Sequence, residues 1–180
     1  MYVQTQNTPN PNSLKFLPGK QVSMDGPYEI LDKKESNNEL IRNILAINGV
    51  TGIFLSEDFL SVNKKDDAKW EDLKHIIISF INDFYATGKE CVINKKKELD
   101  SDSDLKEVEK KIISILETKV RPAVARDGGD IKFKEFKDGI VTVQLQGSCS
   151  GCPSSTMTLK QGVQNLLCHY IPEVKEVSAI

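Results

Sequence analysis

Two cysteines, Cys149 and Cys152, form a Cys-x-x-Cys pair that is followed at once by Pro153. Two thiols at this spacing can chelate a soft metal or form a redox-active disulfide. Pro153 suits the first turn of a helix, and the partial positive charge at a helix N-terminus favours thiolate over thiol. Thiolate binds iron, zinc or an iron-sulfur cluster, and it also attacks disulfides. The pair therefore indicates a reactive dithiol before it indicates which reaction.

Hydrophobic periodicity predicts the elements that hold this pair. Residues 140–146 alternate apolar and polar side chains, which is typical of a strand with one buried face. After the pair, apolar residues recur at helical spacing until Pro172. The expected order is a helix over 105–120 that kinks or restarts at Pro122, two strands around the Asp138-Gly139 turn, the cysteine pair, a helix, and a strand at 174–180. The second half is thus expected to be an α+β domain.

The first half shows the pattern of another α+β unit. Its opening, residues 8–13, is rich in Pro and Asn and predicts an ordered turn or a recognition loop. The expected elements are strands at 14–17 and 21–24, a helix over 39–47, a hairpin over 50–64, and a helix over 70–84 that ends near Gly88. We therefore expect antiparallel strands packed by two helices.

A polar segment at 91–103 separates the two halves. It has almost no apolar residues after its start, and its charge changes from lysine-rich to acidic midway. Such a composition predicts a flexible linker. The expected fold class is α+β, with small domains at 1–90 and 104–180, each an antiparallel or mixed sheet packed by two helices.

Composition excludes several classes of function. The chain has 180 residues, 39% hydrophobic and 28% charged, and a formal net charge of -2, so it has no basic excess to hold nucleic acid. No apolar run approaches the length of a membrane span. Four cysteines and no secretory signal at the start favour a reducing compartment. We expect a cytoplasmic, bacterial protein, or a mitochondrial matrix protein if the chain is a processed organellar one.

Two possible functions of the pair would need only a single chain. A thioredoxin-like dithiol is disfavoured because no aromatic residue precedes Cys149 and too little chain follows Cys152 for the remaining sheet. A structural zinc site needs four ligands, and the chain has no second cysteine pair. The remaining candidates are scattered along the chain: Cys91, Cys168, His75 and His169. Of these, Cys168 is interpreted as a bystander.

An iron-sulfur cluster, which is usually held by four thiolates, is satisfied if two protomers each supply Cys149 and Cys152. Gly147 and Gly151 would let the backbone turn tightly and expose the sulfurs. A cluster on a loop between subunits could leave by ligand exchange, which favours a carrier. No His stands at a readable spacing to activate Ser154 or its neighbour, so no catalytic role is assigned. A redox or zinc-binding module that uses the same pair stays open as the alternative.

Several segments of the chain carry a family resemblance. Residues 120–130 (VRPAVARDGGD) together with 145–155 (LQGSCSGCPSS) resemble the NifU C-terminal domain, and the combination is far more specific than the cysteine pair alone. Residues 6–16 (QNTPNPNSLKF), with Gly49-Val50 and Asp58-Phe59, resemble the N-terminal domain of Nfu proteins. Together the two resemblances cover nearly the whole chain.

The resemblance implies an Nfu-type iron-sulfur cluster scaffold or carrier that is not an enzyme. It implies that Cys149 and Cys152 bind the cluster, usually 4Fe-4S with 2Fe-2S as the alternative, across a homodimer. It also implies upstream assembly proteins as donors and recipient apoproteins as acceptors, with no nucleic acid and no membrane among the partners. The role implied for the first domain is to recognise those partners.

Overall fold

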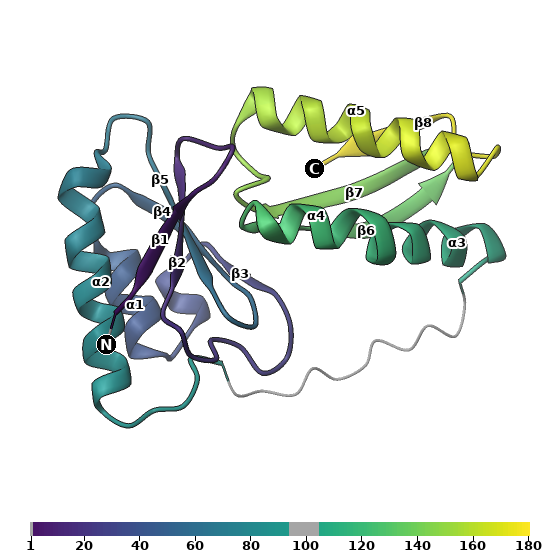
Figure 1. The fold of residues 1–180 in the computed structure, drawn as a ribbon. Coiled ribbons are helices and arrows are strands. Elements are labelled where there is room, and N and C mark those ends of the chain that lie inside the picture. Colours follow the sequence, from purple (N-terminus) through teal and green to yellow (C-terminus); the bar gives the residue numbers. More distant parts are fainter. Residues whose placement is uncertain (1, 94–104) are drawn as a thin grey trace. The chain divides into compact units, whose positions relative to one another are not determined.

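The computed structural model describes residues 2–93 and 105–180, and no side chain is described for Ser155. Within these ranges the chain forms two compact units, one before and one after the segment 94–104 (Figure 1). Each unit is one sheet with helices packed on it. The predicted class of two small α+β domains is confirmed, whereas most of the predicted linker lies outside the described residues.

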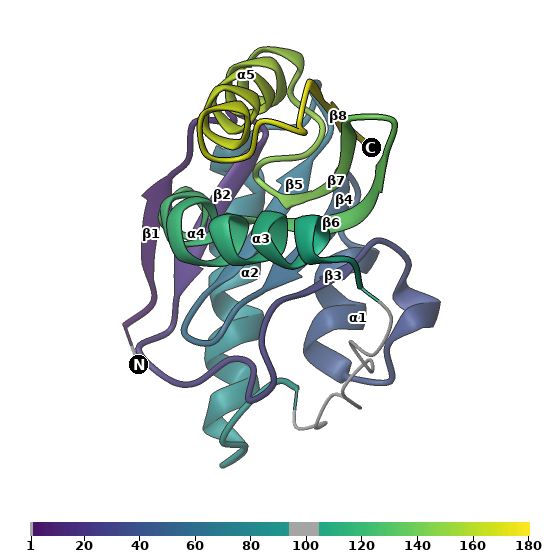
Figure 2. The ribbon, with the colours of Figure 1, turned by 90° about the vertical axis from the view of Figure 1, so that its right-hand side faces the viewer.

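The first unit is built on a five-stranded antiparallel sheet with the strand order β1-β2-β5-β4-β3. Its strands are β1 (Gln4–Asn7), β2 (Ser13–Leu17), β3 (Tyr28–Ile30), β4 (Val50–Leu55) and β5 (Leu60–Lys64). A short 3-10 helix, Lys33–Glu35, follows β3, and the helices α1 (Glu39–Ala46) and α2 (Trp70–Ala86) lie on one face of the sheet (Figures 1 and 2). The predicted helices and the predicted hairpin over 50–64 are confirmed.

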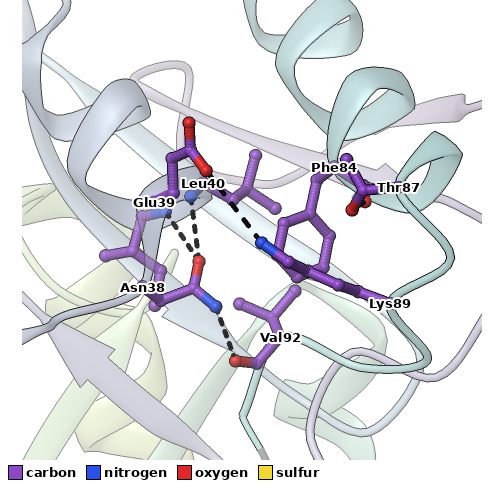
Figure 3. A network of polar contacts seen from close by, with 8 residues as sticks. Asn38, Glu39, Leu40, Phe84, Thr87, Lys89 and Val92 are labelled. Carbon is purple, nitrogen blue, oxygen red and sulfur yellow. Dashed lines mark hydrogen bonds and ion pairs between the residues drawn. The ribbon is translucent and has the colours of Figure 1, made fainter.

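The start of α1 is tied to the end of the first unit (Figure 3). The Asn38 side-chain oxygen accepts the Leu40 amide at 2.9 Å, and its side-chain nitrogen donates to the Val92 carbonyl at 2.8 Å. Lys89 lies 4.0 Å from the Glu39 carboxylate. Val92 is buried in the core of this unit. The predicted linker, 91–103, therefore begins too early, because Val92 is anchored to α1.

One other prediction in the first unit is wrong, and two strands of its sheet were missed. Residues 21–24 form no strand: the Val22 amide donates to the Glu57 carbonyl at 2.7 Å, and the Val22 carbonyl accepts from Val92 at 2.8 Å. The strands β1 and β3 were not expected. Both lie at the edges of the sheet, where β1 has no apolar residue to reveal an alternation.

The second unit has a three-stranded sheet with the order β6-β7-β8. The strands are β6 (Gly129–Lys137), β7 (Ile140–Gly147) and β8 (Glu176–Ala179); β6 pairs antiparallel with β7, and β8 pairs parallel with β7. The helices α3 (Glu107–Ile115), α4 (Arg121–Arg126) and α5 (Pro153–Tyr170) lie on one face of this sheet (Figures 1 and 2). All the elements predicted for this half are present.

The α3 and α4 helices are joined by a π-helical turn, Leu116–Val120. Pro122 lies in the first turn of α4, where its missing N–H breaks no helical bond. The Arg121 amide donates to the Leu116 carbonyl, the bond that widens the turn. Where a kink or a restart at Pro122 is predicted, the structure therefore has a π-helical turn that runs directly into α4. Among the described helices, none combines the length and apolar character needed to cross a bilayer.

Candidate metal centre

The cysteine pair lies in the loop between β7 and α5. Gly147 and Gly151 take left-handed backbone angles, with φ of 65° and 79°, which side chains rarely adopt. The Ser150 amide and hydroxyl both bond to the Gly147 carbonyl, at 3.2 and 2.9 Å. Cys152 is the residue that caps the start of α5. The pair therefore lies at the strand-to-helix junction predicted from the sequence, on a tight turn.

The two thiols lie in different surroundings. Cys149 belongs to the core of the second unit, whereas Cys152 is partly exposed and its sulfur lies 3.3 Å from the Ser154 hydroxyl oxygen. Burial raises the pKa of the Cys149 thiol to about 12; a hydrogen bond with Ser148 lowers the pKa in part, and the charges of Asp127 and Asp130 raise it. The expectation that the glycines expose both sulfurs is thus wrong for Cys149.

Burial disfavours the thiolate of Cys149, so the partly exposed Cys152 is the thiol of the pair that another molecule reaches first. A bound metal ion would lower the pKa of Cys149, since a metal ion deprotonates a coordinating thiol outright.

The turn at 127–130 packs directly against the cysteine loop. A Cβ at Gly129 would lie 2.5 Å from the Cys149 sulfur and 2.7 Å from the Gln146 carbonyl oxygen. The Ser148 amide donates to the Gly128 carbonyl at 3.2 Å, and the Ser148 hydroxyl donates to the Asp127 carbonyl. The two segments that carry the family resemblance in this half therefore meet in space, and only glycine fits at 129.

An ion pair between Arg121 and Asp130 stabilises the turn at 127–130. The Arg121 guanidinium makes two bonds to the buried Asp130 carboxylate, at 2.8 and 3.0 Å, and also lies 3.8 Å from Glu117. Paired hydrogen bonds of this kind set orientation as well as energy. Asp130 pairs across the sheet with Gln146, just before the cysteine loop. The Arg121–Asp130 ion pair thus holds α4, β6 and the cysteine loop in one arrangement. Sequence reasoning missed this role, although both charges lie in the 120–130 segment.

Thr156 is the second residue that sequence reasoning missed. Its hydroxyl donates to the Cys149 carbonyl at 3.1 Å, and its amide donates to the Cys152 carbonyl at 2.9 Å. The amide bond is the ordinary first bond of a helix, but the hydroxyl bond reaches back across the loop. No sequence signal distinguishes Thr156 from other helical threonines.

The cysteine loop itself holds two thiols, and the other candidate ligands lie elsewhere in the described residues. Cys168 lies near the other end of α5, about 24 Å along the helix axis from Cys152 at the usual rise per residue. Cys91 and His75 belong to the first unit, and the ring of His169 packs on Tyr170. Within 2–93 and 105–180, no group of three or more His, Cys, Asp or Glu residues could hold a metal ion. The cysteine loop therefore offers two thiols, and a four-thiolate site needs two more.

A groove of about 840 Å³ opens beside the pair. It is lined by Gly151 and Cys152 at one end and runs between α5 and β8. The Lys160 ammonium and the Glu176 carboxylate in its lining are 3.8 Å apart. Met157, also in the lining, exposes 71% of its surface. An exposed methionine beside Cys152 is suited to contact with another protein.

Comparison with known proteins assigns both units. The model of the NifU-like domain matches residues 112–178, and the model described as "Scaffold protein Nfu/NifU N terminal" matches residues 3–88. The "NifU-like protein 4, mitochondrial" of Arabidopsis thaliana is 41% identical over 184 residues, which cover 98% of this chain and 65% of that protein. The "NFU1 iron-sulfur cluster scaffold homolog, mitochondrial" of Homo sapiens is 44% identical over 187 residues, which cover 100% of this chain and 72% of that protein.

These matches define a class of two-domain scaffold proteins and not a class of enzymes, as the resemblance implied. The chain belongs to the NifU/Nfu family, with an Nfu N-terminal domain followed by a NifU-like domain. It spans about two thirds of the length of the curated relatives named here.

Proposed function

We propose that this chain binds an iron-sulfur cluster through Cys149 and Cys152 and passes it to proteins that require one. The observation that carries the proposal is a tight loop that holds two cysteines, among described residues that form no group of three or more metal-ligating side chains. The name of the Homo sapiens relative as an iron-sulfur cluster scaffold supports it.

The cluster is of the 4Fe-4S type and is bridged by two copies of the chain, so that two cysteine pairs complete the four thiolates. Transfer is ligand exchange. A recipient thiol loses its proton and bonds to iron, while Cys149 or Cys152 leaves the iron and regains a proton. No electron is transferred, and no bond in the protein backbone or the cluster core breaks.

The partners are upstream assembly proteins, which supply the cluster, and recipient apoproteins. The domain at 1–90 recognises these partners, and the domain at 104–180 carries the cluster. The relatives named as mitochondrial favour the mitochondrial matrix over the bacterial cytoplasm as the place of action.

Anaerobic reconstitution with iron and sulfide tests the proposal. Iron and sulfide analysis, Mössbauer spectroscopy and size-exclusion chromatography would be run on the wild type and on Cys149→Ser, Cys152→Ser and Cys168→Ser. We expect one 4Fe-4S cluster per dimer in the wild type and in Cys168→Ser, and none in the other two variants.

Cluster loading of Cys149→Ser at the wild-type level would refute the proposal. Zinc in the isolated protein that no cluster can replace, or a reversible disulfide that reduces insulin, would support the alternative module instead.

A further inference from the structure

Thr156 bonds to the backbone of both cysteines, and we infer that it is a positioning residue that sets their relative placement. Its hydroxyl accounts for the 3.1 Å bond to the Cys149 carbonyl, and its amide for the 2.9 Å bond to the Cys152 carbonyl. Through these two hydrogen bonds, Thr156 is linked to both ends of the segment from Cys149 to Cys152. The inference rests on the proposed function, because it assigns a role toward the bound cluster.

The loop needs these hydrogen bonds because its two glycines would otherwise allow the backbone to adopt other conformations. Gly147 and Gly151 have left-handed angles, and a Cβ added at Gly151 would meet nothing within 4 Å. Glycine gains the most conformational freedom when a constraint is removed. The Cys149 side is fixed by the turn at 127–130, whereas Cys152 is fixed by the start of α5. The Thr156 hydroxyl is a direct link between these two anchors.

The other two threonines in helical segments of this unit, Thr118 and Thr158, show what an ordinary helical hydroxyl does. Thr158 donates to the Ser154 carbonyl at 3.0 Å, and Thr118 donates to the Ser114 carbonyl at 2.7 Å. Both bonds reach back by one helical turn. The Thr156 hydroxyl instead reaches seven residues back, out of the helix and into the cysteine loop. Thr158 is therefore a matched control on the same helix.

A cluster held by two such loops would be sensitive to this bond. Cluster binding needs each pair of sulfurs at a fixed separation, and a loop that samples other separations loses part of its binding free energy to ordering. Removing one hydrogen bond of ordinary strength predicts cluster release that is about two- to tenfold faster.

The test compares Thr156→Val, Thr156→Ser and Thr158→Val in the full chain. Valine keeps the shape of threonine without the hydroxyl, and serine keeps the hydroxyl. The loss of cluster to an iron chelator is followed by visible absorption, and the electronic environment of the cluster by Mössbauer spectroscopy. We expect faster loss and a broadened iron spectrum in Thr156→Val, and wild-type behaviour in Thr156→Ser and Thr158→Val.

A second measurement uses the protein without cluster, so that it stays informative if the proposed function fails. Amide hydrogen exchange at Ser150, Gly151 and Cys152 should be faster in Thr156→Val and unchanged in Thr158→Val. Equal exchange and equal cluster loss in all variants would overturn the inference, as would a serine variant that behaves like valine.

Should Thr156→Val fail to fold, the wild-type protein carries the test. The Thr156 hydroxyl proton should then exchange slowly enough to be seen by NMR, with a contact to the Cys149 backbone. A rapidly exchanging hydroxyl proton would contradict the inference.

Discussion

Two loops of this molecule, one in each unit, are fixed by the same means and used differently. In the first unit, the turn at 8–13 joins β1 to β2, and the Thr8 hydroxyl donates to the carbonyls of Asn10 and Ser13 at 2.9 and 3.0 Å. In the second unit, the hydroxyls of Ser150 and Thr156 hold the cysteine loop in the same way. Both loops are ordered by side-chain bonds to the backbone.

The difference lies in what the fixed loop then touches. The turn at 8–13 is fastened to its own unit: the Trp70 indole donates to the Pro11 carbonyl at 3.0 Å, and the Lys64 ammonium donates to Asn12 at 2.9 Å. The cysteine loop instead opens onto a groove that Cys152 helps to line. Order in a loop therefore does not identify function; what identifies it is reactive groups left at the surface of an ordered loop.

The largest effect is expected from Gly129→Ala, which changes the turn that packs against the cysteine loop. The new methyl group would meet the Cys149 sulfur at 2.5 Å, so the loop must move. We expect cluster loading to be lost and the second unit to be destabilised by about 1–3 kcal/mol. The measurements are iron analysis after reconstitution and urea unfolding.

The matched control for this change is Gly162→Ala within α5, where a Cβ would meet nothing within 4 Å. This control should load cluster normally and gain about 0.5–1 kcal/mol, because alanine favours the helix. A Gly129→Ala protein that loads like the wild type would show that close packing on Cys149 is not needed.

Asp130→Asn comes next, because it breaks the ion pair behind the loop. The change leaves the Arg121 guanidinium beside a neutral group and removes one of its acceptors. Since Arg121 is partly exposed, we expect a loss of about 2 kcal/mol in the second unit, below the cost for a fully buried pair. Thermal unfolding measures it. Glu117→Gln, at the more exposed partner of Arg121, should change stability by less than about 0.5 kcal/mol.

Thr8→Val tests the other loop with the same substitution as Thr156→Val. It removes the bonds to Asn10 and Ser13 and should destabilise the first unit by about 1 kcal/mol. Because this turn is bonded within its own unit, cluster loading and release should be unchanged. Loss of cluster in Thr8→Val, with the second unit intact by amide exchange, would abolish the contrast between the loops.

The smallest effect concerns the pH dependence of the first unit. Burial, and next the charge of Cys91, raise the pKa of Tyr85 from 10.0 to about 12, and its hydroxyl donates to the Gln21 carbonyl at 2.8 Å. The unfolded chain releases this proton at lower pH than the folded chain does, so the stabilisation is complete below pH 10 and is lost as the pH rises toward 12.

We therefore expect Tyr85→Phe to cost about 1 kcal/mol at neutral pH and to flatten the alkaline fall in stability. Urea unfolding between pH 7 and about pH 12, followed by circular dichroism, measures both. An equally steep alkaline fall in the phenylalanine variant would assign the dependence to another group.

The sequence predicts best where the signal is local. The Asp138-Gly139 turn needs positive φ at both residues, and the structure has 54° and 83° there. Likewise the alternation in β7 and the helical spacing in α5 report a buried face directly. These local rules were enough to place Cys149 and Cys152 at a strand-to-helix junction.

Contacts between distant segments could not be predicted from these rules. The packing of Gly129 on Cys149 and the bond from Thr156 to Cys149 depend on tertiary structure, and no periodicity encodes them. The burial of Cys149 follows from this packing, which is why the expected exposure of its sulfur was wrong. The edge strand β1 was not predicted for a different reason, because its residues are all polar, as they would be in a loop.

The parallel pairing of β7 with β8 has a consequence for biosynthesis. Because α5 is the crossover between the two strands, the cysteine loop is translated before Glu176–Ala179, the strand that completes its sheet. At about 5–20 residues per second, the ribosome needs roughly 1 to 5 seconds to make the chain between them. The turn at 127–130, which packs on the Cys149 sulfur, is made before the cysteine loop, so the enclosure of Cys149 does not wait for β8. What β8 adds is one wall of the groove beside Cys152, and docking of β8 is therefore the step that completes this groove.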